Sequence, residues 1–296
     1  MKYAHLLNAF YASPWHVRPE CWAQWHQVLQ RSLSGQEVTP VVIQKTTGKG
    51  YTYGQHFGGT QRPIVGPVED GVPLIEQMIV VGPIAIIPVH GVLGKKLSYL
   101  DLWCGGCDYS YVSEFAEQAM HDPMIESVVF DFDTPGGMSA GCGECGADIA
   151  ALSRVKPTVA FTENQCCSAG YWLASQCREF WATPTAVVGN VGTILCGVDS
   201  SANWAQEGYK LELFASSPLK ATGVDGKPWT PEDRAYLQER MMQCDARIKA
   251  AVQTGRPQIK PEALDGRWFF AENSLDLGVV DAIAADLDEA LSALLA

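Results

Sequence analysis

The sequence of 296 residues has no uninterrupted apolar run of the ~18–20 residues that a membrane-spanning helix needs. The longest candidate, Ile79 to Leu93, is broken by glycine, proline and histidine, which is a pattern typical of a buried strand. The first twelve residues are mildly apolar and carry one lysine, but Asn8 interrupts them, whereas a secretory signal needs an unbroken apolar core and a small-residue cleavage site. We therefore expect neither a membrane span nor a signal peptide.

Charge is scarce, and positive charge is scarcer than negative charge. Charged residues make up 18% of the chain, against roughly 25% in an average protein. The 21 Lys and Arg residues are outnumbered by 33 Asp and Glu residues, so the net charge is −12 and phosphate-bearing partners such as nucleic acid are disfavoured. The hydrophobic content of 47% supplies a large core and excludes a disordered chain.

Cysteine, in contrast, is plentiful, with ten residues. Several lie in apolar or glycine-rich stretches, so free thiols that pack as small hydrophobes fit better than a disulfide framework, and the expected compartment is the cytoplasm. Two C-x-x-C pairs, Cys104/Cys107 and Cys142/Cys145, leave a zinc site open as an alternative, which requires the pairs to meet in space. Our expectation is no metal and no cofactor.

The chain divides into two regions by composition. Residues 1–75 hold one amphipathic pattern, Pro19–Leu33, followed by a Gly/Thr/Pro-rich arm or linker. Residues 76–296 alternate apolar runs of strand length with helical patterns, which predicts an α/β domain with a mainly parallel sheet.

The expected elements of the second region follow from these patterns. Strands are expected at Ile84–Val89, Ser127–Phe132, Thr158–Thr162, Glu179–Ala182, Gly192–Leu195 and Leu211–Phe214. Helices are expected at Ser110–Met120, Ser139–Leu152, Ser168–Ser175, Pro231–Thr254 and Leu287–Leu295. Thr230 is expected to cap the long helix, whose apolar stripe of Leu237, Met241, Cys244, Ile248 and Val252 is typical of a packing helix.

Two turns carry residues suited to acyl-transfer chemistry. Asp133 to Gly137 follows a predicted strand and ends in Pro-Gly-Gly, where exposed backbone N–H groups can bind an oxyanion; an ordinary glycine turn is the alternative. Ser168 opens a predicted helix and is either a nucleophile or a helix cap. The surrounding sequence is not a Gly-x-Ser-x-Gly elbow, because Cys166 replaces the first glycine.

A serine nucleophile needs a base, and two candidates are available. All six histidines lie at or before position 121, and His90, Asp133 and Ser168 follow the chain order of one triad class. Lys220, which follows a predicted strand, is the other candidate. A free lysine has a pKa near 10.4, so a neutral base would require burial against apolar neighbours.

Together these motifs resemble the signal-peptide-peptidase-A-type serine proteases, which use a Ser-Lys dyad. The resemblance runs from about Ile84 to the end of the chain and rests on several collinear motifs: Ile87–Gly91, Pro135–Gly137, Ser168–Ser175, Thr183–Gly192, Lys220, Gly255–Arg256 and Leu277–Asp281. It implies the fold of the Clp-protease and crotonase group, with Ser168 as the nucleophile and Lys220 as the general base.

The resemblance also implies an oxyanion hole formed by Gly136 or Gly137 together with Ala169. Thr134 and Asn190 depart from the family pattern, since each replaces a usual serine. The serine at the position of Asn190 can hold the catalytic lysine, and an asparagine amide oxygen can also accept from an ammonium.

The N-terminal stretch Asn8–Trp15 is similar to the head-maturation proteases of tailed phages, including the lambda-type capsid protease. This implies a homo-oligomeric serine endopeptidase that processes scaffold, portal or capsid proteins in the host cytoplasm or in the assembling prohead. Two alternatives stay open: a crotonase-like thioester enzyme, which would not need Ser168, and a capsid-assembly protein with a degenerate protease fold.

Overall fold

A six-stranded sheet forms the centre of the computed structural model, which describes residues 15–17, 78–98, 101–102 and 105–295. The strand order is β13-β10-β8-β6-β3-β2, and every neighbouring pair is parallel except β2 with β3. The strands are β2 (Ile79–Val81), β3 (Ile84–His90), β6 (Ser127–Asp133), β8 (Thr158–Thr162), β10 (Glu179–Ala182) and β13 (Ala282–Ile283). The predicted α/β class with a mainly parallel sheet is therefore confirmed.

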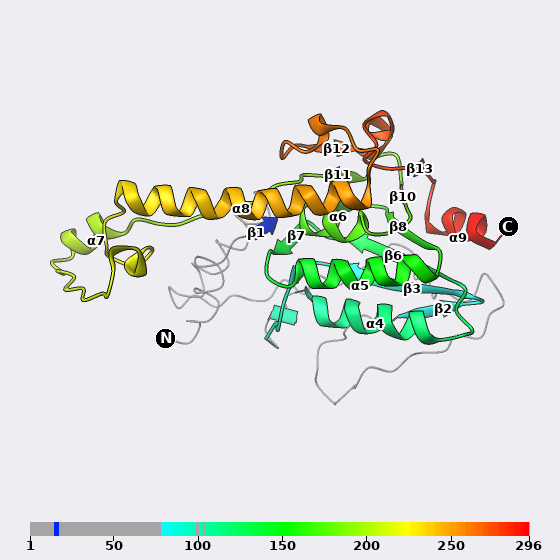
Figure 1. Ribbon diagram of the computed structural model, residues 1–296, viewed down its shortest axis with the longest axis horizontal. Coiled ribbons are helices and arrows are strands. Elements are labelled where there is room, and N and C mark those ends of the chain that lie inside the picture. The colour runs from blue at the N-terminus through cyan, green and yellow to red at the C-terminus, as the bar shows by residue number, and fades with distance from the viewer. Residues whose placement is uncertain (1–14, 18–77, 99–100, 103–104, 296) are drawn as a thin grey trace.

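Helices cover both faces of this sheet, which is why its strands are almost continuously apolar. Alternate residues of β3 point to opposite faces: Ala85 and Ile87 belong to the core shared with α4 and α5, whereas Ile84 and Ile86 pack with α9. The helices of the domain body are α4 (Tyr109–His121), α5 (Cys142–Val155), α6 (Ala169–Ala174) and α9 (Leu287–Leu295). Figure 1 shows α4 and α5 side by side on one side of the sheet and α9 near its far edge.

Two small sheets extend the carboxyl ends of the central strands. One has the order β1-β7-β4-β5, formed by β1 (Trp15–Val17), β7 (Gly136–Met138), β4 (Val92–Gly94) and β5 (Gly106–Asp108). The other has the order β12-β11-β9, formed by β12 (Trp268–Phe270), β11 (Val187–Gly189) and β9 (Gln165–Cys167). Because the carboxyl ends of parallel strands meet at one edge, this is the place where a site is expected.

A long projection leaves the domain body. Helix α8 (Pro231–Gly255) packs by its C-terminal end on α6, while its N-terminal half extends away together with α7 (Ser201–Gln206) and the 3₁₀ turn η1 (Pro218–Ala221). We call residues 197–242 the arm. Its buried residues within the described chain are Ala221, Gly226 and Asp233.

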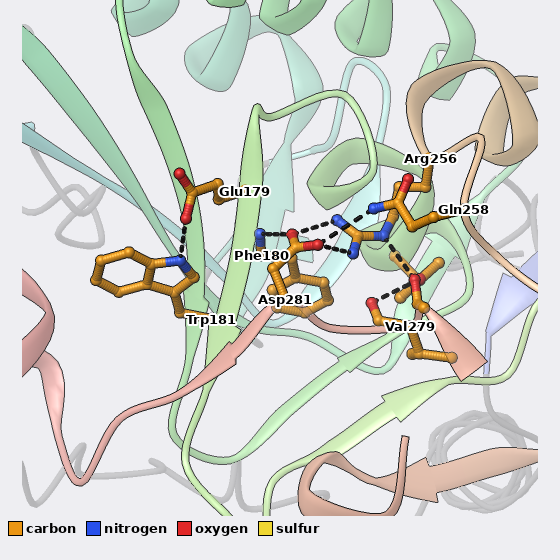
Figure 2. A network of polar contacts seen from close by, with 9 residues as sticks. Glu179, Phe180, Trp181, Arg256, Gln258, Val279 and Asp281 are labelled. Carbon is orange, nitrogen blue, oxygen red and sulfur yellow. Dashed lines mark hydrogen bonds and ion pairs between the residues drawn. The ribbon is translucent and has the colours of Figure 1, made fainter. Parts of the chain in front are cut away.

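The end of α8 is fixed to the sheet by an ion pair in which the arginine is buried and the aspartate is partly exposed (Figure 2). Arg256, of which 1% is exposed, donates Nη1 and Nη2 to Asp281 at 2.9 and 2.8 Å. Asp281 also accepts from the backbone N–H of Phe180 in β10 at 2.7 Å. The Tyr171 hydroxyl of α6 donates to the carbonyl of Val279 at 2.8 Å, so α6, α8 and β10 are all connected to residues 278–281. The remaining turns in this part of the chain are η2 (Pro261–Ala263), η3 (Ala271–Asn273) and η4 (Leu275–Leu277).

The expected strands and helices of the domain body lie within three residues of the observed bounds. Two expected strands are wrong, because Gly192–Leu195 and Leu211–Phe214 form no named strand in the described chain. The second lies in the arm, away from the sheets, where Phe214 is 93% exposed. Apolar composition alone therefore did not make it a strand.

The α8 stripe is confirmed only in part. Ile248 and Val252 are buried where the helix meets the body, but Leu237, Met241 and Cys244 are only partly covered. Thr230 caps the helix as expected, in a capping box with Asp233. The Pro19–Leu33 helix lies outside the described residues, so the boundary between 1–75 and 76–296 stays a prediction. Within the described residues, no helix has the length and apolar character to cross a membrane.

Candidate active site

Ser168 lies in the turn between β9 and α6 in a backbone conformation that is rare for a residue with a side chain. Its φ and ψ are +54° and −112°, and 1% of the residue is exposed. Such backbone strain costs about 1–3 kcal/mol and is concentrated at functional sites. Asn190, which also has a positive φ of +53°, lines the same pocket. The strain therefore indicates a functional site at the end of β9.

The side chain of Ser168 does not act as an ordinary helix cap. Its Oγ donates to the carbonyl of Gly192 at 3.3 Å, and its backbone N–H donates to the carbonyl of Gly189 at 2.8 Å. The capping alternative would need Oγ to accept from the first turn of α6, and this bond does not form. The capping interpretation is therefore wrong, and the hydroxyl faces the segment that follows β11.

The Pro-Gly-Gly turn lies beside this serine. The Thr134 N–H donates to Gln165 at 2.9 Å, and the Cys167 N–H donates to Thr134 at 3.1 Å, so the turn runs along β9. The Gly136 N–H donates to Thr134 Oγ1 at 3.1 Å, and Gly137 lies in β7 between β1 and β4. Thr134 Oγ1 in turn donates to Gly91 at 2.6 Å, so the threonine orders the turn.

Ala169, the other predicted donor, is the first residue of α6. Its carbonyl accepts a weak bond from the Cys142 thiol at 3.7 Å. The first backbone N–H groups of a helix have no partner within the helix and carry partial positive charge. The structure thus places Ser168, Ala169 and the glycine turn next to one another.

Replacing Gly137 by alanine should remove activity and destabilise the fold. A Cβ at this position would lie 2.0 Å from the carbonyl oxygen of Leu93, so β7 would have to move away from β4. Loss of one oxyanion donor typically lowers kcat by about 10²–10³. Gly143→Ala in α5 is the matched control, because its Cβ would meet its nearest neighbour at 3.4 Å. Peptidase assays and thermal unfolding would compare the activity and the stability of the two variants. Equal activity and equal stability of Gly137→Ala and Gly143→Ala would contradict the prediction.

A pocket of about 240 Å³ opens at Ser168. Its lining consists of Ser168, Asn190, Val191, Gly192, Thr193, Ile194, Asp245, Lys249, Asp265 and Gly266. Asn190 Nδ2 donates to the carbonyl of Gly266 at 2.6 Å, and the Asn190 N–H donates to Arg267 at 2.8 Å. Asn190 therefore connects the end of β11 to the loop before β12. Because it lines the same pocket as Ser168, its side chain can contact a group that enters this pocket.

Three charged residues that line this pocket, Asp245, Lys249 and Asp265, are not among the candidates from the sequence. Asp245 and Lys249 lie one turn apart on α8 and form an ion pair at 2.7 Å. Their i, i+4 spacing is visible in the sequence, but such pairs are common on solvated helix faces. Only the packing of α8 on α6 shows that this pair faces the serine.

Lys220, the predicted base, lies elsewhere. It is exposed on η1, and the next turn is bonded to the start of α8 through Thr222 Oγ1 and Asp233 Oδ1 at 2.6 Å. The pocket residue Asp245 lies about 18 Å further along α8 at 1.5 Å per residue, a distance that Lys220 does not span from this turn. Figure 1 shows α7 and the arm at one end of α8 and α6 near the other end. One chain therefore does not bring Lys220 to its own Ser168.

His90 ends β3 and lies in register with Asp133 at the end of β6. Its Nε2 lies 3.2 Å from Asp131 Oδ2, whereas Asp133 Oδ1 accepts from Asn164 at 2.9 Å. His90 therefore has an aspartate contact at Asp131, and the triad alternative stays a prediction.

The cysteines in the described part of the chain are free thiols. Cys142 and Cys145 lie buried at the start of α5, and burial raises the pKa of both thiols well above the ordinary value. Cys107 lies in β5, while Cys104 lies outside the described residues. Within the described residues, no three His, Cys, Asp or Glu side chains are grouped so as to hold a metal ion.

Comparison with known proteins gives matches to proteases. The profile of peptidase family S49 matches residues 150–295. Capsid assembly protease C of Escherichia phage lambda is 30% identical over 226 residues, which cover 74% of this chain and 51% of that protein. Head-tail preconnector protein GP5 of Enterobacteria phage P21 is 29% identical over 206 residues, which cover 69% of this chain and 41% of that protein.

Among solved structures, a mutant of the 1510-N membrane-bound stomatin-specific protease with a substrate peptide matches with a TM-score of 0.39 and 16% identity, over 71% of this chain and 79% of that chain. The chain spans about half or less of the length of the two phage relatives. The family match contains Ser168, Lys220 and the residues 277–281 on which the resemblance rests. The predicted resemblance is confirmed: the chain is similar to peptidase family S49 over residues 150–295 and to the capsid assembly protease of phage lambda.

Proposed function

We propose that this chain is a serine endopeptidase that cleaves scaffold, portal or capsid proteins during assembly of a phage head. The observation that carries the proposal is the strained, buried Ser168 at the start of α6, a helix that packs against the glycine strand β7. The similarity to the capsid assembly protease of phage lambda supports the class of substrate.

The chemistry is acyl transfer. Ser168 Oγ attacks the peptide carbonyl while a base takes its proton, and the N–H groups of Gly137 and Ala169 stabilise the oxyanion. The protonated base then gives its proton to the leaving amine. Water attacks the resulting ester, and the same base assists that step. These steps need one neutral base within hydrogen-bond reach of Oγ and no cofactor.

Lys220 of a neighbouring copy is the base that this proposal assigns. In its own chain the lysine is exposed on an arm that projects beyond the body, so it is available to a second molecule. Asn190, whose Nδ2 is held by Gly266, can accept from the incoming ammonium through its amide oxygen. Exposed apolar residues of the arm, including Phe214 and Tyr209, offer contact area for that copy. The proposed enzyme is therefore a homo-oligomer.

Lys249 is the alternative base within one chain, because it lines the same pocket as Ser168. Its Nζ is held in an ion pair with Asp245 Oδ2 at 2.7 Å. A base role for Lys249 would require this pair to break first. We therefore assign the base to Lys220.

The nucleophile is tested with a fluorophosphonate probe, which labels an activated serine. Ser168→Ala should lose both labelling and proteolysis, while Ser175→Ala at the end of α6 should keep the labelling. A thioester enzyme or a degenerate assembly protein would show no labelling at Ser168. Cleavage of purified scaffold or portal protein, with the new termini read by mass spectrometry, tests the class of substrate.

A further inference from the structure

We infer that Asp233 positions Lys220 for catalysis by fixing the turn of the arm that carries the lysine. The inference rests on the proposed function, since it concerns the lysine assigned there. Asp233 lies at the start of α8, far from the Ser168 pocket, so it would act through Lys220 and would not touch the substrate.

Asp233 is buried although most residues of the surrounding arm are exposed or partly exposed. Its side chain is 3% exposed, and it is the one charged residue classed as buried in the described arm. The other buried residues of the arm, Ala221 and Gly226, offer little side-chain surface for a hydrophobic core. A buried carboxylate is stable only when it is paired and hydrogen-bonded.

Asp233 meets that requirement by binding three residues of the preceding loop. Oδ1 accepts from Thr222 Oγ1 at 2.6 Å, and Oδ2 accepts from both the N–H and the Oγ1 of Thr230 at 2.9 Å. Lys227 Nζ forms an ion pair with Oδ2. The bonds from Lys227, Thr222 and Thr230 hold the pKa of Asp233 well below its usual range, so the carboxylate is ionised at neutral pH.

These contacts bear directly on the turn that holds Lys220. Thr222 ends η1, and its N–H donates to Leu219 at 3.2 Å, while the Lys220 N–H donates to Ser217 at 3.2 Å. The bond from Thr222 to Asp233 therefore fixes η1 on α8. Misplacing a catalytic group by about 1 Å can lower a rate about 10²-fold, so the turn must be held accurately.

Asp233 also belongs to the capping box of α8, so a test must separate positioning from helix capping. Thr222→Val makes that separation, because it removes the bond to Asp233 Oδ1 and leaves both bonds of the capping box. We expect this variant to lower kcat at least about tenfold, with KM, thermal unfolding and oligomeric state unchanged. Thr254→Val, which removes an exposed side-chain bond at the other end of α8, is the matched control and should keep full activity.

The second test uses mixed oligomers of full-length chains with a fluorogenic peptide as substrate. Asp233→Ala alone should lose about 10²-fold in kcat. Mixing it with Ser168→Ala should restore activity, because the second chain supplies an intact arm to the first chain's serine. Mixing it with Lys220→Ala should restore nothing, because neither chain then has a correctly held lysine.

The outcomes separate the inference from the function on which it rests. If Lys220→Ala and Ser168→Ala restore each other but Asp233→Ala is not restored by Ser168→Ala, the positioning role is overturned and the shared site stands. If Lys220→Ala and Ser168→Ala fail to restore each other, both proposals fall. If Asp233→Ala does not fold, Thr222→Val decides alone, and full activity in that variant overturns the inference.

Discussion

Mixing Ser168→Ala chains with Lys220→Ala chains should restore proteolysis that neither variant shows alone. The reason is the separation of the two residues: Ser168 lies in the body beside α6, and Lys220 lies on the arm at the far end of α8. A site made from two chains needs an intact serine from one and an intact lysine from the other. In an equal mixture, half of the chains carry an intact serine and the other half carry an intact lysine. About a quarter of the sites in a closed oligomer would therefore combine an intact serine with an intact lysine.

The measurement is the rate of peptide cleavage after the two variants are mixed, dissociated and reassembled. Each variant alone should lose at least about 10³-fold, because residues that act as one unit fail together. Lys249→Ala is the informative comparison. If Lys249→Ala is inactive while Lys220→Ala keeps wild-type activity, the base belongs to the same chain as the serine, and the shared site is refuted.

Arg256→Ala should destabilise the protein by about 1–3 kcal/mol, because it removes charge-assisted hydrogen bonds of a buried guanidinium whose partner, Asp281, is 26% exposed. The guanidinium is 1% exposed and binds Asp281 through two nitrogens, while its Nε donates to Gly278 at 3.1 Å. The carboxylate of Asp281 would keep its bonds from Phe180 and Gln258 but lose its positive partner (Figure 2). Chemical denaturation followed by circular dichroism would measure the loss.

Arg267→Ala is the control for this prediction. Arg267 also pairs with an aspartate, Asp265, but both side chains are largely solvated, at 62% and 41% exposed. Exposed pairs contribute little to stability, so the midpoint of unfolding should hardly move. Similar losses in the two arginine variants would show that burial is not what makes the Arg256 pair important.

The central sheet could be predicted because its inner strands β3, β6 and β8 are buried on both faces, which leaves a nearly continuous apolar run such as that of β3. The same rule failed for Leu211–Phe214, whose apolar run lies in the arm with no sheet beside it. The short strands β7 and β9 were missed as strands because they arise from pairing at the sheet edge, and three residues carry no periodic signal.

The site could be predicted in part, for a related reason. Ser168, Ala169 and the glycine turn are local features of the loops that follow strands, and parallel strands bring those loops together. The distance from Lys220 to Ser168 depends on the direction and length of α8, which no local pattern reports. Asp245 and Lys249 face the pocket for the same reason, since only the packing of α8 on α6 turns them inward.

The separation of serine and lysine makes activity a property of chain concentration under the proposed arrangement. A single dilute chain would hold a strained nucleophile without a base, and it would be harmless to surrounding proteins. Association obeys mass action, so the fraction of completed sites would rise steeply where chains are crowded together. Confinement inside a closing shell would then switch proteolysis on at the place and time of assembly, without a separate activating cut.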